Sequence, residues 1–218
     1  ARRAPIGTRI GQAAQHAVLT DDRVRFAQTH RIRKKHEIAV PTLLQGALAL
    51  MVSVHIVPFA RDQGIGLAGA SLALTTYGLG AALGRLTGGA FSDRLGPRTT
   101  IYVAYGLTAV ALLALRWIPS REILLASVAL FGAGFAATDT MVVKVVPDLF
   151  GMRAIGAIMG ILPPGWRCGA ALGPAAAGFL HDFTGSYAIA FGAAPFAVVA
   201  SAVLFALGTS SSRATGGL

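Results

Sequence analysis

The stretch Gly84-Arg85-Leu86-Thr87-Gly88-Gly89-Ala90-Phe91-Ser92-Asp93-Arg94-Leu95-Gly96-Pro97-Arg98 decides the fold. A glycine-rich apolar run leads into it, and a second apolar run begins shortly after it at Ile101. Its Asp-Arg pair, with glycine, proline and another arginine close behind, indicates a tight cytoplasmic turn between two membrane helices. The stretch also leaves Arg85 about 12 Å up the first of these helices from the turn. A charge at that depth is costly unless it faces protein or water, so Arg85 is a candidate functional residue.

The composition is that of a membrane protein. Of the 218 residues, 54% are hydrophobic and 13% are charged, whereas soluble domains carry about 25% charged residues. The 27 glycines suit membrane helices that pack closely. A net charge of +10 could suit nucleic acid, but the charges lie at the ends of apolar runs. We therefore predict a lipid bilayer, and no nucleic acid, as partner.

Six apolar runs are each long enough to cross a bilayer, which takes about 20 residues in a helix. Backbone groups in lipid must pair within their own segment, so helices are expected for all six. The runs cover residues 39–60, 67–92, 99–117, 122–146, 153–180 and 187–208. The sequence thus predicts an all-α membrane domain over residues 38–208, a basic cytoplasmic loop or leader at 1–37, and a cytoplasmic tail at 209–218.

The distribution of basic residues predicts the orientation. With the leader inside, the inner segments hold fourteen lysines and arginines and the outer loops hold three. Because positive charge concentrates on the cytoplasmic side, we expect both termini there, in the plasma (inner) membrane. The chain opens on Ala1 rather than on methionine, so we also expect it to be part of a longer protein.

Glycine recurs every four residues on two of the predicted helices. Such ladders form a groove that a neighbouring backbone can approach closely, so we expect them to serve helix packing. They are Gly80, Gly84 and Gly88 on the second helix, and Gly165, Gly169 and Gly173 on the fifth. Pro163-Pro164 is expected to interrupt the fifth helix near its middle. This break could line a substrate cavity or could be a kink without substrate contact.

With six helices and that turn, the sequence resembles the C-terminal half of a major facilitator superfamily transporter. The family signature Gly-x-x-x-Asp-Arg-x-Gly-Arg-Arg reads here as Gly89-Ala90-Phe91-Ser92-Asp93-Arg94-Leu95-Gly96-Pro97-Arg98, with a proline in place of one arginine. Two stretches are similar to the monocarboxylate-carrier and oxalate–formate-antiporter branch: Val54-His55-Ile56-Val57-Pro58-Phe59-Ala60-Arg61-Asp62 and the run from Gly169 to Tyr187. The resemblance implies a twelve-helix carrier that works by alternating access, in which an N-terminal six-helix half is the partner. It also implies a role in the conformational change for the signature residues Gly89, Asp93, Arg94, Gly96 and Arg98.

The resemblance gives Arg85 a role. Monocarboxylate carriers hold the substrate carboxylate with an arginine on this helix, and Arg85 matches that position. Its planar guanidinium suits a carboxylate bidentately. The family has an acidic residue one turn before this arginine, and in this chain Ala81 stands at that position. Arg85 therefore has no acidic partner there for proton-linked pairing. The alternative is a structural arginine bound to helix ends or to a carboxylate.

Two other charges lie inside the predicted spans. Arg167 is expected near the bilayer midplane, and oxalate–formate antiporters use a basic residue on this helix, at the position that Trp166 holds here. Arg167 could bind a dicarboxylate together with Arg85, or pair with a carboxylate of the other half. Asp139 is expected either as the countercharge of an arginine or as a protonatable coupling group. Trp166 and Tyr77 are candidate walls of the site.

The sequence therefore predicts a secondary active transporter for a small organic anion, a mono- or dicarboxylate, driven by protons or by exchange and without a cofactor. No paired carboxylates, nucleophile motif or phosphate loop indicates an enzyme. No cluster of histidine, cysteine or acidic residues has the spacing of metal ligands, and His55 and His181 are interpreted as hydrogen-bonded structural groups. The alternatives are a facilitator carrier for a drug or sugar, with a structural Arg85, and a truncated six-helix membrane module without transport activity.

Overall fold

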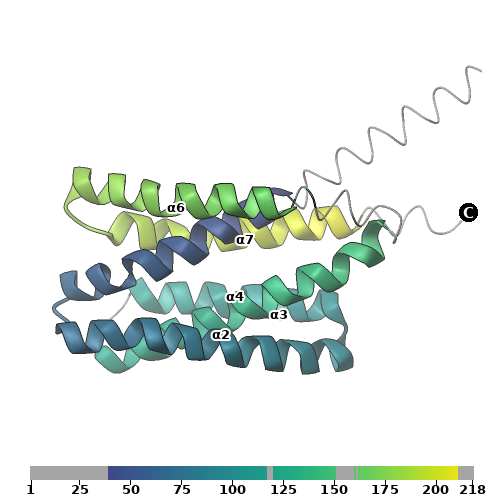
Figure 1. Ribbon diagram of the computed structural model, residues 1–218, viewed down its shortest axis with the longest axis horizontal. Coiled ribbons are helices and arrows are strands. Elements are labelled where there is room, and N and C mark those ends of the chain that lie inside the picture. Colours follow the sequence, from purple (N-terminus) through teal and green to yellow (C-terminus); the bar gives the residue numbers. More distant parts are fainter. Residues whose placement is uncertain (1–38, 117–119, 151–159, 161, 211–218) are drawn as a thin grey trace, which may run out of the picture.

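A computed structural model describes residues 39–116, 120–150, 160 and 162–210 (Figure 1). The predicted leader and most of the predicted tail lie outside these ranges. Within them every regular element is an α-helix, and five of the six helices, all but α6, are long and apolar enough to cross a membrane. The helices are the first helix (Ala39–Asp62), α2 (Leu67–Leu95), α3 (Pro97–Arg116), α4 (Arg121–Phe150), α6 (Leu162–Thr184) and α7 (Ala188–Ser210). The predicted all-α membrane fold is confirmed.

The fifth predicted run differs most from the structure. Helix α6 begins at Leu162, so Pro163 and Pro164 lie in its first turn. Whether they interrupt a longer helix, as expected, stays a prediction, because residues 151–159 and 161 lie outside the described residues. Proline is tolerated in a first turn because its missing N–H would have no helical partner there. Pro174 is the proline inside α6. The start of the predicted run, 153–159, lies outside the described residues.

The turn in the deciding stretch is a single residue. Helix α2 continues through Leu95 and α3 begins at Pro97, so only Gly96 separates them. Gly96 has a φ of +83°, a left-handed conformation that glycine adopts without strain. Its N–H donates to the carbonyl oxygen of Ser92 at 2.9 Å. Pro97 then starts α3 with a backbone angle that already suits a helix. This pair of residues makes the reversal between the two spans sharp.

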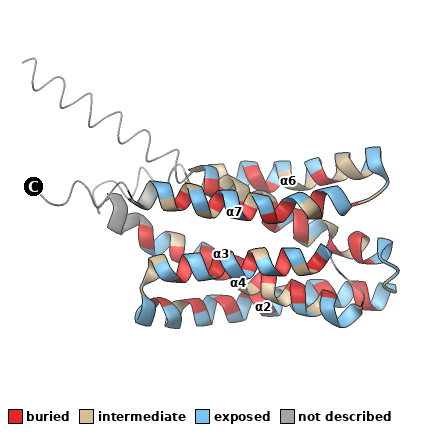
Figure 2. Ribbon diagram, turned by 180° about the vertical axis from the view of Figure 1, so that it is seen from behind, coloured by how far each residue is buried: buried red, intermediate tan, exposed pale blue. Residues whose placement is uncertain are grey.

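The helices form two groups of three, and the views from the front and from behind agree on this arrangement (Figures 1 and 2). In one group α2 and α3 both pack on α4. In the other the first helix packs on α6, and α7 lies beside them. Contacts between α3 and α7 join the two groups.

Glycines of both ladders lie where two helices approach most closely. A methyl group added at any of four ladder glycines would overlap a backbone carbonyl oxygen of the neighbouring helix. The overlapping pairs are Gly80 with Ala129, Gly84 with Ala133, Gly169 with Leu43, and Gly173 with Ala47. A methyl group at Gly88 would come within 2.9 Å of the Ala137 side chain, whereas one at Gly165 would reach only ordinary contact, 3.6 Å from Thr42 Oγ1.

The two close crossings share one pattern. Gly132 of α4 lies against the backbone of Tyr77 on α2, and Gly46 of the first helix lies against the backbone of Trp166 on α6. Each aromatic residue stands three positions before a ladder glycine, so Tyr77 and Trp166 occupy equivalent positions. An internal repeat of three helices within six is common among membrane transporters.

The outside of the bundle is apolar. The largest fully buried side chains include Phe131 and Phe191, yet many large apolar side chains are exposed (Figure 2). Leu86 on α2 is 73% exposed and Phe196 on α7 is 75% exposed. A soluble monomer rarely exposes so much apolar surface, whereas helices that face lipid or further helices do.

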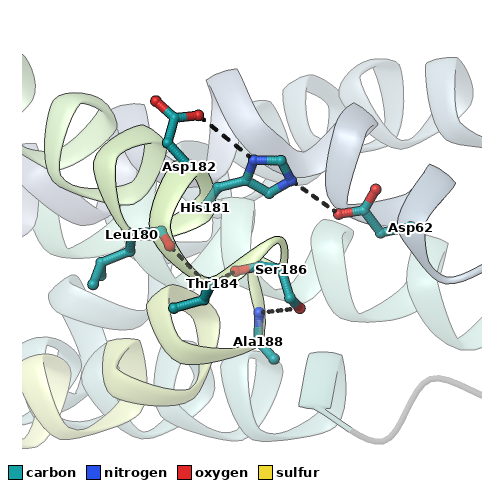
Figure 3. A network of polar contacts seen from close by, with 7 residues as sticks. All are labelled: Asp62, Leu180, His181, Asp182, Thr184, Ser186 and Ala188. Atoms are coloured by element: carbon teal, nitrogen blue, oxygen red, sulfur yellow. Dashed lines mark hydrogen bonds and ion pairs between the residues drawn. The ribbon is translucent and has the colours of Figure 1, made fainter.

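The end of the bundle opposite the α2–α3 turn carries a histidine between two carboxylates. His181 Nε2 lies 3.7 Å from Asp62 Oδ2, and its Nδ1 lies 3.9 Å from Asp182 Oδ1 (Figure 3). His55 Nε2 donates to the carbonyl oxygen of Pro174 at 3.1 Å. Both histidines therefore connect the first helix to α6, which is a structural role.

Candidate functional site

A cavity of about 330 Å³ lies between the first helix, α4 and α6. We call it the outer cavity. Three residues singled out in the sequence line it together: Asp139 of α4, and Trp166 and Arg167 of α6. Its other lining residues are Thr42, Val142, Val143 and Pro163. The side chains of Arg167 and Asp139 are exposed and that of Trp166 is half-buried, so both charges are accessible to a solute.

The start of α6 places two of these side chains. Because the helix begins at Leu162, Trp166 and Arg167 lie in its second turn, nearer its beginning than the midspan position expected for Arg167. Two of the first-turn residues of α6, Pro163 and Pro164, have no backbone N–H. The positive charge on the α6 side of the outer cavity therefore comes from the Arg167 guanidinium.

A smaller chamber of about 30 Å³ adjoins the outer cavity, with which it shares Thr42, Asp139, Val142 and Trp166. We call it the inner chamber. Its remaining lining residues come from the first helix, α3, α4 and α7: Pro41, Gln45, Tyr105, Phe135, Thr138 and Phe205. Gln45 is only 6% exposed. In the described part of the chain, neither its Nε2 nor its Oε1 has a hydrogen-bond partner, and the same is true of Trp166 Nε1.

Arg85 and Tyr77 of α2 are not among the residues that line these two cavities. The Arg85 side chain is exposed, and Tyr77 is half-buried with its ring stacked near Phe131 at 5.9 Å between centroids. Electrostatic interactions nevertheless connect Arg85 to both Tyr77 and Asp139. The positive charge of α2 thus acts on the carboxylate that lines the outer cavity.

Direct ion pairs with other described residues do not neutralise the charges of the site. Between described residues, no N···O distance of 4.0 Å or less joins Arg85, Arg167 or Asp139 to a charged partner. Asp139 therefore acts on Arg85 at longer range than a salt bridge. A guanidinium group without a carboxylate partner retains its full capacity to bind an anionic solute.

The lining residues that were not identified from the sequence include two polar ones on the first helix. Thr42 and Gln45 stand one helical turn apart in the first helix and line the inner chamber together. The signal that could have found them is a pair of polar residues on one face of an otherwise apolar span, because polar groups inside a membrane are costly and mark functional sites.

The signature residues lie around the α2–α3 turn, on the side away from the histidine contacts. Lys144 of α4 reaches this turn, and its Nζ lies 3.4 Å from Asp93 Oδ1 and 3.5 Å from Ser92 Oγ. The Lys144 and Asp93 side chains are 44% and 77% exposed. Gly89 has open space around it, and Arg94 is exposed in the last turn of α2. The remaining members are Gly96 in the turn and a half-buried Arg98 at the start of α3.

Known proteins resemble the chain in sequence. Monocarboxylate transporter 11 of Mus musculus is 31% identical over 162 residues, which cover 70% of this chain and 36% of that protein. Monocarboxylate transporter 12 of Rattus norvegicus is 28% identical over 172 residues, which cover 77% of this chain and 35% of that protein. The chain thus spans about a third of the length of these relatives.

A solved structure shares the fold. The in meso crystal structure of the POT family transporter PepTSo matches with a TM-score of 0.73 at 18% identity, covering 82% of this chain and 37% of that one. This partial coverage fits one half of a twelve-helix bundle. The sequence profile of the Major Facilitator Superfamily matches residues 42–216. This match spans most of the chain and agrees with the signature at the α2–α3 turn and with the paired glycine crossings. The chain therefore belongs to the Major Facilitator Superfamily.

Proposed function

We propose that this chain is the C-terminal half of a secondary active carrier that moves a small organic anion by alternating access against an N-terminal six-helix half. The observation that carries the proposal is the outer cavity, where Arg167 and Asp139 are accessible and without a direct ion pair to another described residue. Charged groups inside a membrane protein are retained where they bind solutes or ions. The printed names of the relatives support a carboxylate as the class of anion.

The balance of charge favours an anion over a neutral or cationic solute. Arg85 and Arg167 supply two guanidinium groups. Among the described residues, Asp139 is the carboxylate that interacts with Arg85 and lines the outer cavity together with Arg167. The site therefore has a net positive charge when it is empty, and a monoanion would neutralise it. A dicarboxylate would do so when Asp139 is protonated. Carriers commonly form such sites from several helices at the interface of their repeats.

The outer cavity lies toward the end of the bundle that carries the signature turn. Its lining residues come from the beginnings of the first helix and of α6 and from the second half of α4. The positive-inside rule puts that end in the cytoplasm. The cavity would then be the cytoplasmic part of the substrate path, with both termini on the same side.

A ligand series that varies only in charge tests the substrate class. With both halves of the carrier purified together, lactate and oxalate should raise the melting temperature, while lactamide, which has the shape of lactate without its charge, should not. A ligand at a hundred times its Kd stabilises the folded state by about 2.7 kcal/mol. An equal shift with lactamide, or a shift only with a sugar or a lipophilic cation, would favour the drug or sugar carrier instead.

Removing the charge of Asp139 should tighten anion binding and slow the net turnover of the carrier. In Asp139→Asn the empty site keeps two unbalanced arginines, so we expect tighter anion binding and slower return of the empty carrier. Exchange uptake should change little, whereas net uptake should fall about tenfold, which corresponds to about 1.4 kcal/mol on the return step. Uptake into proteoliposomes, with and without anion inside, separates the two rates. Glu122→Gln, at the far end of the same helix, is the matched control. Equal loss of exchange and net uptake would contradict this role.

The signature carboxylate should matter for transport and little for stability. An ion pair as exposed as Lys144–Asp93 contributes about 0.2–1 kcal/mol, so Asp93→Asn and Lys144→Met should each lower the unfolding free energy by less than about 1 kcal/mol. If Asp93 also takes part in the conformational change, Asp93→Asn alone should reduce uptake strongly. Thermal unfolding and uptake of both variants check this. Equal losses of uptake in Asp93→Asn and Lys144→Met would mean that loss of the ion pair accounts for the whole fall in uptake. Asp93 would then have no separate part in the conformational change.

A further inference from the structure

We propose that Gln45 and Trp166 form a subsite for one hydroxyl group of the transported anion. By this subsite the carrier would distinguish hydroxylated anions from anions that have only hydrogen at that carbon. The inference rests on the proposed function, which needs the arginines but does not need this subsite. The subsite gives a function to the inner chamber. In the proposed function the arginines hold the carboxylate, and the amide of Gln45 and the indole of Trp166 do not.

The first observation is a buried amide without a partner. Gln45 is 6% exposed, and neither atom of its amide has a hydrogen bond within the described part of the chain. A buried amide left unsatisfied costs about 1–3 kcal/mol. Trp166 lines the same chamber, and its indole N–H is equally unpaired in that part of the chain. Two orphaned groups at one small cavity point to an occupant that pairs with both.

The neighbouring polar side chains of the chamber do not hydrogen-bond to the Gln45 amide or to the Trp166 indole. The Thr42 hydroxyl donates to the carbonyl oxygen of Ala39 at 2.8 Å, and the Thr138 hydroxyl donates to that of Gly134 at 3.0 Å. Tyr105 interacts with the Gln45 side chain across the chamber, but not with the geometry of a hydrogen bond to either amide atom. The amide and the indole therefore remain available to a group that enters from the outer cavity.

Size and charge limit the occupant. A volume of about 30 Å³ holds one or two water-sized groups, so a whole carboxylate with its attached carbon does not fit. Among the described residues that line it there is no lysine or arginine, and the one charged residue is Asp139. An anionic group would be repelled by that carboxylate, whereas a neutral hydroxyl can donate to it. The occupant is therefore a single neutral oxygen.

A hydroxyl group can pair with both the hydrogen-bond donors and the acceptors of the inner chamber. It donates one hydrogen bond and accepts two. Gln45 Oε1 or Asp139 can accept from it, and Gln45 Nε2 and Trp166 Nε1 can donate to it. Because the inner chamber shares Asp139 and Trp166 with the outer cavity, an anion held by Arg167 can place a hydroxyl inside the chamber. Sites built to hydrogen-bond a substrate group reject analogues that lack it, since their buried polar groups stay unpaired.

The test compares uptake of 2-hydroxybutyrate and butyrate by the carrier with both halves present, in proteoliposomes. We expect the unmodified carrier to prefer 2-hydroxybutyrate at least about tenfold. Gln45→Met keeps the length of the side chain and removes its polar atoms, so the preference should fall close to one through loss of 2-hydroxybutyrate uptake. Trp166→Phe removes the N–H and should lower the preference in the same direction. Thr108→Val, which changes a buried hydroxyl on α3 away from both cavities, should leave the preference unchanged.

Stability separates a subsite from a structural role. Replacing an unpaired buried amide by an apolar group should leave the melting temperature of Gln45→Met unchanged or raised. A lowered melting temperature, or equal loss of both anions, would overturn the subsite. Equal uptake of the two anions by the unmodified carrier would also overturn it, as expected if only water occupies the chamber, while the anion function stands. Uptake of neither anion would also overturn the subsite, whereas the proposed function would be refuted only if no other carboxylate were taken up either.

Discussion

Replacing Arg85 by lysine is expected to lower anion uptake about ten- to a hundredfold while the protein still inserts and folds. A lysine keeps the charge but not the planar pair of donors that binds a carboxylate bidentately. Hydrogen bonds to charged groups contribute about 1.5–3 kcal/mol, which gives that range of uptake. Arg85 is exposed and has no ion pair within 4.0 Å among the described residues, so its replacement should cost little stability.

Two comparisons make the result specific. Arg61→Lys changes an exposed arginine at the end of the first helix, away from both cavities, and should leave uptake unchanged. Arg167→Lys should reduce uptake to a similar degree as Arg85→Lys if both arginines hold the anion. Unchanged uptake in Arg85→Lys, with normal membrane insertion, would show that Arg85 is structural.

Substituting leucine at Gly84 is expected to destabilise the bundle by about 3 kcal/mol or more. Even a methyl group there would overlap the carbonyl oxygen of Ala133, so α2 and α4 would have to separate. Gly78 provides a control on the same helix, because nothing lies within 4 Å of a methyl group added there. Gly78→Leu should therefore be neutral or stabilising, since glycine inside a helix costs about 0.5–1 kcal/mol relative to alanine.

Thermal unfolding in detergent and the yield of monodisperse protein measure both variants. A loss of stability at Gly84 alone locates the effect in the helix crossing rather than in glycine content. Similar losses at both positions would mean that leucine on this helix is harmful wherever it stands, and would contradict the packing role. Gly169→Leu should behave like Gly84→Leu, because Gly169 meets the first helix in the same way.

Much of the fold could be predicted because its signals are local. The single-residue turn at Gly96 follows from glycine and proline in sequence, and most helix ends lie within a few residues of those expected. The start of α6 at Leu162 could not be predicted from hydropathy, since apolar residues continue on both sides of it. There the proline pair was the better signal, because prolines are tolerated in a first turn.

The site could be predicted only in part. Asp139 and Arg167 stood out because charges are rare in membrane spans, and the structure brings both to the outer cavity. Gln45 did not stand out, because a neutral amide is a weaker signal than a charge. In the folded chain Gln45, Tyr105 of α3 and Trp166 of α6 line one cavity, and there the Gln45 amide has no hydrogen-bond partner among the described residues. Contacts between residues so far apart in the chain have no local pattern in the sequence.

The central proposal is that this half-bundle carries an anion, and counterflow uptake tests it most directly. Proteoliposomes containing both halves of the carrier are loaded with unlabelled substrate, and entry of the labelled compound is followed with and without a pH gradient. The panel is lactate, pyruvate, formate, oxalate, a neutral sugar and a lipophilic cation. We predict uptake of one or more carboxylates and of neither the sugar nor the cation, and the response to the gradient then distinguishes proton symport from exchange. Uptake only of the sugar or the cation would contradict the anion function, and no uptake of any compound would favour a membrane module without transport activity.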